Sequence, residues 1–313
     1  MTQTEHQKVI AANNANFNED FVKAYEKRDS QRILAILFVK YLLEYDFEHP
    51  TTRKSAAETE QILGDPNLET NGLSVAKDLP DPSTYLTKFP NSIFKPGMKL
   101  LDFACGSGIV TELFVPYLKG GERSELYGMD INSIFLEYFN KRASRHASFD
   151  LDFKSFQYDV LDQAVQDELD DKFANHFDAI FCTISYHHIH NYELVTKKLA
   201  TFLRPGGWLF IIDFYNEDVE TAKGDTSQAV QHMGGLKIDA LNRTLGEIAG
   251  LVNVSSAREF RTYNWSPEHF IVNHSRQEIL DKLSKGQLPS KVIDGEVNYL
   301  IDSSLIYAVG QRA

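Results

Sequence analysis

The stretch that most constrains the fold runs from Lys99 to Ile109 and reads KLLDFACGSGI. Its first five residues are mostly apolar and indicate a buried strand, and Gly106-Ser-Gly108 indicates a tight turn where backbone comes close to another group. Apolar residues then recur at helical spacing, so the order is strand, glycine-rich loop and helix. An acidic residue, Asp130, ends the next apolar run 22 residues beyond Gly108. In this architecture such a loop cradles a nucleotide-like ligand, and such an acidic residue accepts from a ribose hydroxyl.

The loop does not carry the dinucleotide pattern, which needs a third glycine after two spacer residues. Thr111 stands at that position, and Ala104 stands where the first glycine would be. The form Asp-Phe-Ala-Cys-Gly-Ser-Gly instead resembles motif I of the class I S-adenosylmethionine-dependent methyltransferases, whose usual form is Asp-x-Gly-x-Gly-x-Gly. Ala104 departs from that form by one methyl group, whereas Gly106 and Gly108 agree with it.

The resemblance continues in order along the chain, over residues 98–262, with a final strand expected at 300–310. Several motifs in the right order are far more specific than one glycine loop. They include the family's third-strand acidic segment, its fourth strand and following loop, its Arg-Pro-Gly-Gly turn with the fifth strand, and the helix end before the sixth strand. The matching segments are Gln157–Val160, Phe177–Ile189, Leu203–Asp213 and Ile248–Val254.

The resemblance implies S-adenosylmethionine as cofactor and assigns roles to three acidic residues. Asp102 would orient the amino-acid portion of the donor, Asp130 would bind the ribose, and Asp159 would accept from the adenine amino group. Purely structural roles stay open for all three: a loop cap, the N-cap of the helix at residue 132, and a turn residue. The full set of implied cofactor contacts is Asp102, Ala104, Cys105, Gly106, Ser107, Asp130, Ile131, Asp159, Val160, Cys182 and Thr183.

Histidine and tyrosine side chains supply the candidates for acceptor chemistry. His187, His188 and His232 are the candidate catalytic bases, needed only if the acceptor is a hydroxyl or a protonated amine. A metal site at His187, His188 and His190 is the weaker interpretation of that cluster, because no second carboxylate ligand is evident, and no metal is expected. Cys105 and Cys182 are interpreted as small buried hydrophobic residues. Aromatic side chains with polar tips are the candidate substrate contacts: Tyr25, Tyr186 and Tyr215.

Composition restricts the partners. The 313 residues include 32 basic and 44 acidic side chains, a net charge of −12, which disfavours nucleic acid as an electrostatic partner. Two cysteines indicate no disulfide framework, and the polar N-terminus has no apolar signal region. No apolar run approaches the length of a membrane span. We therefore expect a soluble, cytoplasmic protein with no membrane partner; the sequence leaves its oligomeric state open.

Alternating strand and helix patterns predict an α/β fold with a doubly wound, mostly parallel seven-stranded sheet and an N-terminal helical cap. Residues 1–97 form the predicted cap, in which 1–19 are polar and expected to be mobile. Residues 98–313 form the predicted Rossmann-like core, with insertions at about 215–235 and 263–298. Within the second insertion, Ser266-Pro-Glu predicts a helix over 267–284.

The sequence therefore predicts an S-adenosylmethionine-dependent methyltransferase acting on a small molecule, with O-, S- or N-methylation left open. The net negative charge and the insertions favour a small acceptor over a nucleic acid. Two alternatives stay open: a methyltransferase of protein or tRNA, and a non-catalytic module that binds S-adenosylmethionine. A basic cleft would favour the first alternative, and a blocked acceptor site the second.

Overall fold

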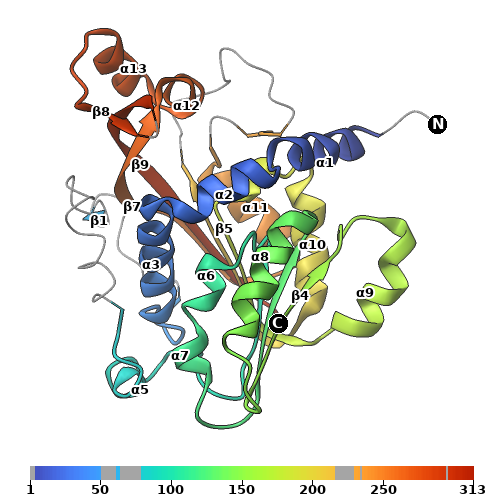
Figure 1. The fold of residues 1–313 in the computed structure, drawn as a ribbon. Coiled ribbons are helices and arrows are strands. Elements are labelled where there is room, and N and C mark those ends of the chain that lie inside the picture. The colour runs from blue at the N-terminus through green and yellow to red at the C-terminus, as the bar shows by residue number, and fades with distance from the viewer. Residues whose placement is uncertain (1–3, 51–60, 64–78, 216–228, 233–234, 294) are drawn as a thin grey trace.

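One twisted sheet organises the chain, and helices cover both of its faces (Figure 1). The structure is a computed structural model that describes residues 4–50, 61–63, 79–215, 229–232, 235–293 and 295–313. The strand order is β1-β7-β9-β6-β5-β2-β3-β4, with β8 beside β9. The strands are β1 (Gln61–Leu63), β2 (Lys99–Phe103), β3 (Ser124–Asp130), β4 (Leu151–Gln157), β5 (Phe177–Thr183), β6 (Leu203–Phe214), β7 (Val252–Pro267), β8 (Ser290–Ile293) and β9 (Glu296–Gln311).

The predicted seven-stranded, mostly parallel sheet is confirmed, with β1 and β8 as short additions. Strands β2 to β6 pair in parallel, whereas β9 runs antiparallel between β6 and β7. The strand order reverses at β2, which pairs β3 on one side and β5 on the other. In open α/β sheets ligands bind outside the carboxyl ends of the strands at such a reversal, so β2 and its glycine loop mark the site.

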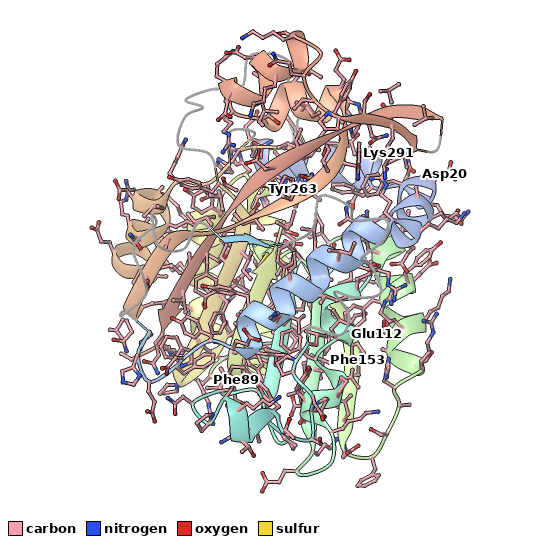
Figure 2. All side chains as sticks on the ribbon, turned by 90° about the vertical axis from the view of Figure 1, so that its left-hand side faces the viewer. Asp20, Phe89, Glu112, Phe153, Tyr263 and Lys291 are labelled. Carbon is pink, nitrogen blue, oxygen red and sulfur yellow. The ribbon has the colours of Figure 1, made fainter. Side chains whose placement is uncertain are left out.

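Side chains of the central strands point alternately to the two faces of the sheet and pack into two separate hydrophobic cores. Leu100 and Phe181 point to a core shared with α3 and α7, whereas Leu101 and Ile180 point to a core shared with α9, α10 and α11. Figure 2 looks onto the first face, which α3 crosses obliquely. The helices named here are α3 (Asp29–Leu43), α7 (Val115–Leu118), α9 (Gln166–Phe173), α10 (Tyr192–Phe202) and α11 (Ile238–Arg243).

The first residues form ordered helices, α1 (Glu5–Asn16) and α2 (Glu19–Lys27), so the expectation of a mobile start is wrong for residues 5–16. A capping box explains why α1 begins where it does. The Thr4 side chain accepts from the Gln7 amide, and the Gln7 side chain accepts from the Thr4 amide. In Figure 1 both helices cross the upper half of the view, below α12 and α13 and above α6 and α8.

The second predicted insertion is a long hairpin rather than a helix between two short strands. Strands β7 and β9 pair along their length, and the hairpin carries α12 (Glu268–His274), α13 (Gln277–Ser284) and β8 (Figure 1). The single helix predicted over 267–284 is therefore wrong, because Ser275 adopts an extended backbone conformation that separates two helices. Ile271, Ile279 and Ile301 form a small core of this hairpin.

Other boundaries differ in detail. The helix predicted after the glycine loop is two short helices, α6 (Ile109–Glu112) and α7, and the predicted Arg-Pro-Gly-Gly turn lies inside β6. The remaining helices are α5 (Tyr85–Lys88), α8 (Ser133–Ser144), the 3₁₀ turns Gln163–Val165 and Tyr186–His188, and the π-helix Thr244–Ile248. Residues 51–60 and 64–78 of the predicted cap, and 216–228 and 233–234 of the first predicted insertion, lie outside the described residues. Among the described residues, no helix is both long and apolar enough to cross a membrane.

Candidate active site

The glycine loop between β2 and α6 turns within a few residues against α8. Gly108 caps α6 with a φ of +82°, and a Cβ there would lie 2.7 Å from a ring carbon of Phe139. Ala104 also has a positive φ, +56°, which an L side chain adopts only with strain. Its amide and that of Cys105 both donate to the Met129 carbonyl, at 2.7 and 3.2 Å, and so fix the loop to β3.

Asp130 ends β3 and holds the loop directly. Its Oδ2 accepts from the Gly106 amide and its Oδ1 from the Asn132 amide, each at 2.9 Å. Burial raises the pKa of this carboxyl, against the opposing effect of the backbone amides that bind it. The N-cap of α8 is Asn132, whose side chain accepts from the Ile134 and Phe135 amides. The alternative that Asp130 caps this helix is therefore wrong.

Asp102 is a buried carboxyl on β2 with no cationic partner among the described residues. It is 2% exposed, and Oδ2 accepts from the Thr111 hydroxyl at 2.5 Å. Burial, together with the nearby Asp130, raises its pKa well above the usual value. Two buried carboxyl groups with raised pKa values make this end of the sheet favourable for a positively charged ligand.

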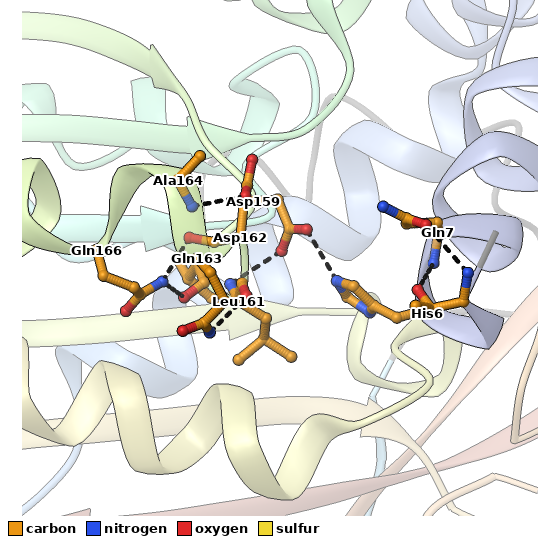
Figure 3. Close-up of polar contacts among 10 residues, drawn as sticks. His6, Gln7, Asp159, Leu161, Asp162, Gln163, Ala164 and Gln166 are labelled. Atoms are coloured by element: carbon orange, nitrogen blue, oxygen red, sulfur yellow. Dashed lines mark hydrogen bonds and ion pairs between the residues drawn. The ribbon is translucent and has the colours of Figure 1, made fainter. Parts of the chain in front are cut away.

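Asp159 follows β4 and binds in two directions (Figure 3). Its Oδ1 accepts from the Leu161 amide at 3.0 Å, and its Oδ2 lies 2.8 Å from Nε2 of His6 on α1. The next residue, Val160, is buried, and its carbonyl accepts from the Gln166 side chain at 3.0 Å. The loop after β4 is thereby tied both to its own turn and to the N-terminal helix.

The other predicted cofactor residues also lie at this edge of the sheet. Ser107 is 2% exposed, and its hydroxyl has no hydrogen-bond partner among the described residues. Ile131 follows Asp130 directly, and its carbonyl accepts from the Gln157 side chain. Cys182 and Thr183 end β5, and burial raises the pKa of the thiols of Cys105 and Cys182, which are therefore protonated at neutral pH.

The predicted histidines follow β5 and are each oriented by one ring nitrogen. His187 is 4% exposed, and its Nδ1 lies 2.7 Å from Oδ1 of Asp213, a fully buried residue of β6. His188 donates from Nδ1 to the Ala229 carbonyl at 2.7 Å, and His232 donates from Nε2 to the Ile189 carbonyl at 3.1 Å. Among the described residues, Asp213 is thus the carboxylate partner of His187.

Asp213 is ionised in this pair. Burial would raise its pKa, but the His187 ring and the amides of Phe214 and His187 outweigh burial, so the pKa lies below its usual value. A carboxylate on Nδ1 leaves Nε2 of a neutral imidazole as the proton-accepting atom. The sequence analysis assigned no role to Asp213, although its position at the carboxyl end of an apolar strand was the available signal.

The three predicted tyrosines lie in different surroundings. Tyr25 on α2 stacks near Phe21 and Phe135, and burial, Glu26 and Asp102 raise its pKa to about 12. Tyr215 follows β6, and its amide donates to the Ser304 carbonyl. Tyr186 is fully enclosed in the core, where its hydroxyl lies 3.2 Å from that of Thr196. Tyr25 lies on α2 and Tyr215 follows the end of β6, whereas the Tyr186 side chain is enclosed in the core beside Thr196 of α10.

Aromatic packing brings the N-terminal helices against this site. The Phe17 ring lies 5.9 Å from Phe135 and 5.4 Å from His188, measured between ring centroids. The Phe17 carbonyl also accepts from the Asn132 side chain at 3.0 Å. Neither Phe17 nor Asn132 was singled out by the sequence, because contacts 115 residues apart leave no mark in local spacing.

An open sheet reversed at a glycine loop, with acidic residues after successive strands, defines a nucleotide-binding α/β enzyme fold. The profile of the methyltransferase domain family matches residues 79–266, more than half of the chain. The chain belongs to this methyltransferase domain family.

Sequence identity to the individual relatives is low. A Schizosaccharomyces pombe protein named an uncharacterized methyltransferase is 26% identical over 205 residues, which cover 66% of this chain and 65% of that protein. The mitochondrial ubiquinone biosynthesis O-methyltransferase of Mus musculus is 33% identical over 132 residues, 41% of this chain and 32% of that protein. A crystal structure of a methyltransferase from Aquifex aeolicus covers 74% of this chain and 90% of its own, with 15% identity and a TM-score of 0.42.

Proposed function

We propose that this methyltransferase acts on a hydroxyl group of a small molecule and that His187 removes the hydroxyl proton. The observation that carries the proposal is the buried pair of His187 and Asp213 at the carboxyl edge of the sheet. A hydroxyl oxygen becomes a good nucleophile only as its proton leaves, so a base is useful for this acceptor and unnecessary for a carboxylate or thiolate. The mouse relative is named as an O-methyltransferase, which supports an oxygen acceptor.

The cofactor site of the proposal uses the buried carboxyls. S-adenosylmethionine supplies an activated methyl group on a positively charged sulfur, so the protein needs chiefly to align and shield the reactants. Its ammonium and sulfonium charges suit the edge where Asp102 and Asp130 are buried with raised pKa values. The buried Ser107 hydroxyl has no hydrogen-bond partner among the described residues, and a bound cofactor would supply one. We assign cofactor binding to Asp102, Ala104, Cys105, Gly106, Ser107, Asp130, Ile131, Asp159, Val160, Cys182 and Thr183.

In the proposed proton transfer, the acceptor hydroxyl gives its proton to Nε2 of His187. Asp213 keeps its negative charge and stabilises the imidazolium that forms. We favour His187 over His188 and His232 because its buried carboxylate partner stabilises an imidazolium strongly. Tyr25 and Tyr215 are the candidate acceptor contacts, and the enclosed Tyr186 is left out of the proposed wall.

A small acceptor is favoured by the N-terminal helices. Phe17 packs on His188 and Phe135, so α1 and α2 lie against the edge from which a macromolecule would have to approach. The whole chain has a net charge of −12, which disfavours nucleic acid as a partner.

The proposal is tested by incubating the enzyme with methyl-labelled S-adenosylmethionine and separate panels of phenols, aliphatic alcohols, thiols, amines, carboxylates, total tRNA and a protein extract. We expect label in a small hydroxyl compound. Label confined to tRNA or protein would contradict the small acceptor. Tight binding of S-adenosylhomocysteine without labelling of any panel would indicate a non-catalytic module.

The role of His187 as the base is tested by measuring turnover of the acceptor identified in this way. Three matched variants are compared: His187→Gln, His188→Gln and His232→Gln. We expect turnover to fall by about 10²- to 10⁴-fold in His187→Gln alone. If all three variants keep full turnover from pH 6 to 9, catalysis is by positioning and His187 is not a base.

The cofactor site has its own test. Asp130→Ala should weaken the binding of S-adenosylhomocysteine by about 1–3 kcal/mol, the usual cost of leaving polar groups unsatisfied. The variant also loses the bonds to Gly106 and Asn132, so circular dichroism should establish that it is folded. An unchanged dissociation constant in the folded variant would remove Asp130 from the ribose site.

A further inference from the structure

The N-terminal helix contributes a side chain to the loop that follows β4. His6 on α1 lies 2.8 Å from Asp159, 153 residues away in the chain, and Figure 3 shows this contact beside the turn that Asp159 makes with Leu161. Both side chains are partly buried, with 27% and 23% exposure. This pair therefore links α1 to the carboxyl edge of the sheet.

A second contact fixes the other end of the same segment. The carbonyl of Phe17, which caps the C-terminus of α1, accepts from the Asn132 side chain. Asn132 lies next to the Asp130 loop, whereas His6 reaches the Asp159 loop. Helix α1 thus lies along the edge that joins the ends of β3 and β4, the two strand ends proposed to bind the ribose and the adenine.

The Asp159 carboxylate can accept further hydrogen bonds in addition to the two described above. A carboxylate has about four acceptor sites on its two oxygens. The Leu161 amide takes one site on Oδ1, and His6 takes one site on Oδ2. The carboxylate is therefore held at both oxygens in one orientation, while further lone pairs stay available for a donor such as an exocyclic amino group.

We propose that His6 is a positioning residue for the cofactor: bound to Asp159, it fixes the carboxylate that accepts from the adenine amino group. The inference rests on the proposed cofactor site and adds to it a residue outside the matched family segment, residues 79–266. His6 acts through Asp159 and makes recognition of the adenine amino group depend on α1.

The pair also has a defined pH response. The hydrogen bond to Asp159 raises the pKa of His6 above 6.5, burial opposes this, and the charges of Asp159 and Asp162 add to it. Below the raised pKa the bond is charge-assisted, and above it the bond is an ordinary one. The hold on Asp159 should therefore weaken as the pH rises, and with it the affinity for the cofactor.

The test measures dissociation constants of S-adenosylhomocysteine and of S-inosylhomocysteine, which has a carbonyl in place of the adenine amino group. The variants are His6→Ala, His6→Gln, which keeps a donor without the charge, and Asp159→Ala. Lys8→Ala is the matched control, because Lys8 lies on the same helix and pairs with Glu5 at the surface. Titration calorimetry at pH 6, 7, 8 and 9 gives the values.

We expect His6→Ala to weaken S-adenosylhomocysteine binding about tenfold at pH 6, with His6→Gln in between and Lys8→Ala unchanged. Binding of the inosine analogue should change less than twofold in His6→Ala. The wild-type affinity should fall from pH 6 to 9, whereas His6→Gln should show no such slope.

Two failures are distinguishable. If Asp159→Ala binds S-adenosylhomocysteine as tightly as the wild type, the proposed adenine site is wrong. If Asp159→Ala weakens binding but His6→Ala does not, or if His6→Ala weakens both compounds equally, the site stands and the positioning role of His6 is wrong.

Discussion

The Asp213 carboxylate binds both the imidazole ring and the backbone amide of His187. Oδ1 lies 2.7 Å from Nδ1 of the ring, and Oδ2 accepts from the His187 amide at 3.1 Å. A third bond comes from the Phe214 amide. A charge with no exposure to water is tolerated because these donors replace the water that it loses on folding.

Removing this carboxylate should destabilise the protein strongly. Asp213→Ala leaves the amides of His187 and Phe214 and a buried ring without their partner, and should lower the free energy of unfolding by about 3–5 kcal/mol. Asp213→Asn keeps an acceptor and should cost about 1–3 kcal/mol. Urea unfolding followed by circular dichroism measures both values, and equal midpoints for wild type and Asp213→Ala would contradict the prediction.

The same carboxylate predicts how stability depends on pH. The pKa of Asp213 is lower in the folded protein than its unfolded value near 3.9, so its stabilising contribution is complete above about pH 4 to 5. That contribution is lost as the pH falls through the folded pKa. The difference in melting temperature between wild type and Asp213→Asn should therefore shrink from pH 5 to pH 2. A constant difference over this range would show that Asp213 does not titrate as described.

The effect of Asp102 on stability should depend on pH in the opposite sense to that of Asp213. Its pKa is raised on folding, so ionisation opposes folding, and the penalty grows as the pH rises above the unfolded value. Asp102→Asn removes the penalty, keeps an acceptor for Thr111, and should raise stability at pH 7 by about 1 kcal/mol. It should also weaken S-adenosylhomocysteine binding about tenfold, as expected where a site gives up stability for function. A less stable variant would contradict the first expectation.

Ala104→Gly should stabilise the protein by up to about 1 kcal/mol. Ala104 has a φ of +56°, where an alanine costs about 1–2 kcal/mol and a glycine costs little, although glycine adds some entropy to the unfolded chain. The matched control is Ala143→Gly in α8, which should destabilise by a similar amount because helical alanine is favoured over glycine. Thermal unfolding compares the two, and the same sign for both would count against the strain at Ala104.

Arg142→Lys should destabilise the protein by about 1–3 kcal/mol although the charge is kept. The Arg142 guanidinium donates to the Ser107 carbonyl of the glycine loop, to Glu112 of α6 and to Glu26 of α2. An ammonium group cannot hold three such partners in a plane. Arg145→Lys at the exposed end of α8 is the control and should change stability by less than about 0.5 kcal/mol. Equal effects in the two variants would contradict the role of Arg142.

The sheet was predictable because its signals are local. Each central strand is a short apolar run, and Gly108 follows the first of them at a position that excludes a side chain. The α1 helix carried a readable signal too, the capping box of Thr4 and Gln7, but its polar sequence lacks the apolar periodicity that predicts helices.

The partners within the site were not predictable in the same way. His6 meets Asp159, and His187 meets Asp213, through tertiary packing that spacing in the chain does not encode. The long hairpin was missed for a related reason. Strands β7 and β9 continue beyond the family pattern and stabilise each other by pairing, so neither needed a strong pattern of its own.

The position of β9 has a consequence for how this protein acquires its structure. Among the described strands, β7 is connected to β6 and the central strands through β9, which pairs with β7 on one side and with β6 on the other. During synthesis from the N-terminus, β7 therefore leaves the ribosome before the strand that connects it to the sheet exists. Until β9 follows, the edge of β6 is open to wrong pairing, and a chaperone that shields strand edges would act at this step.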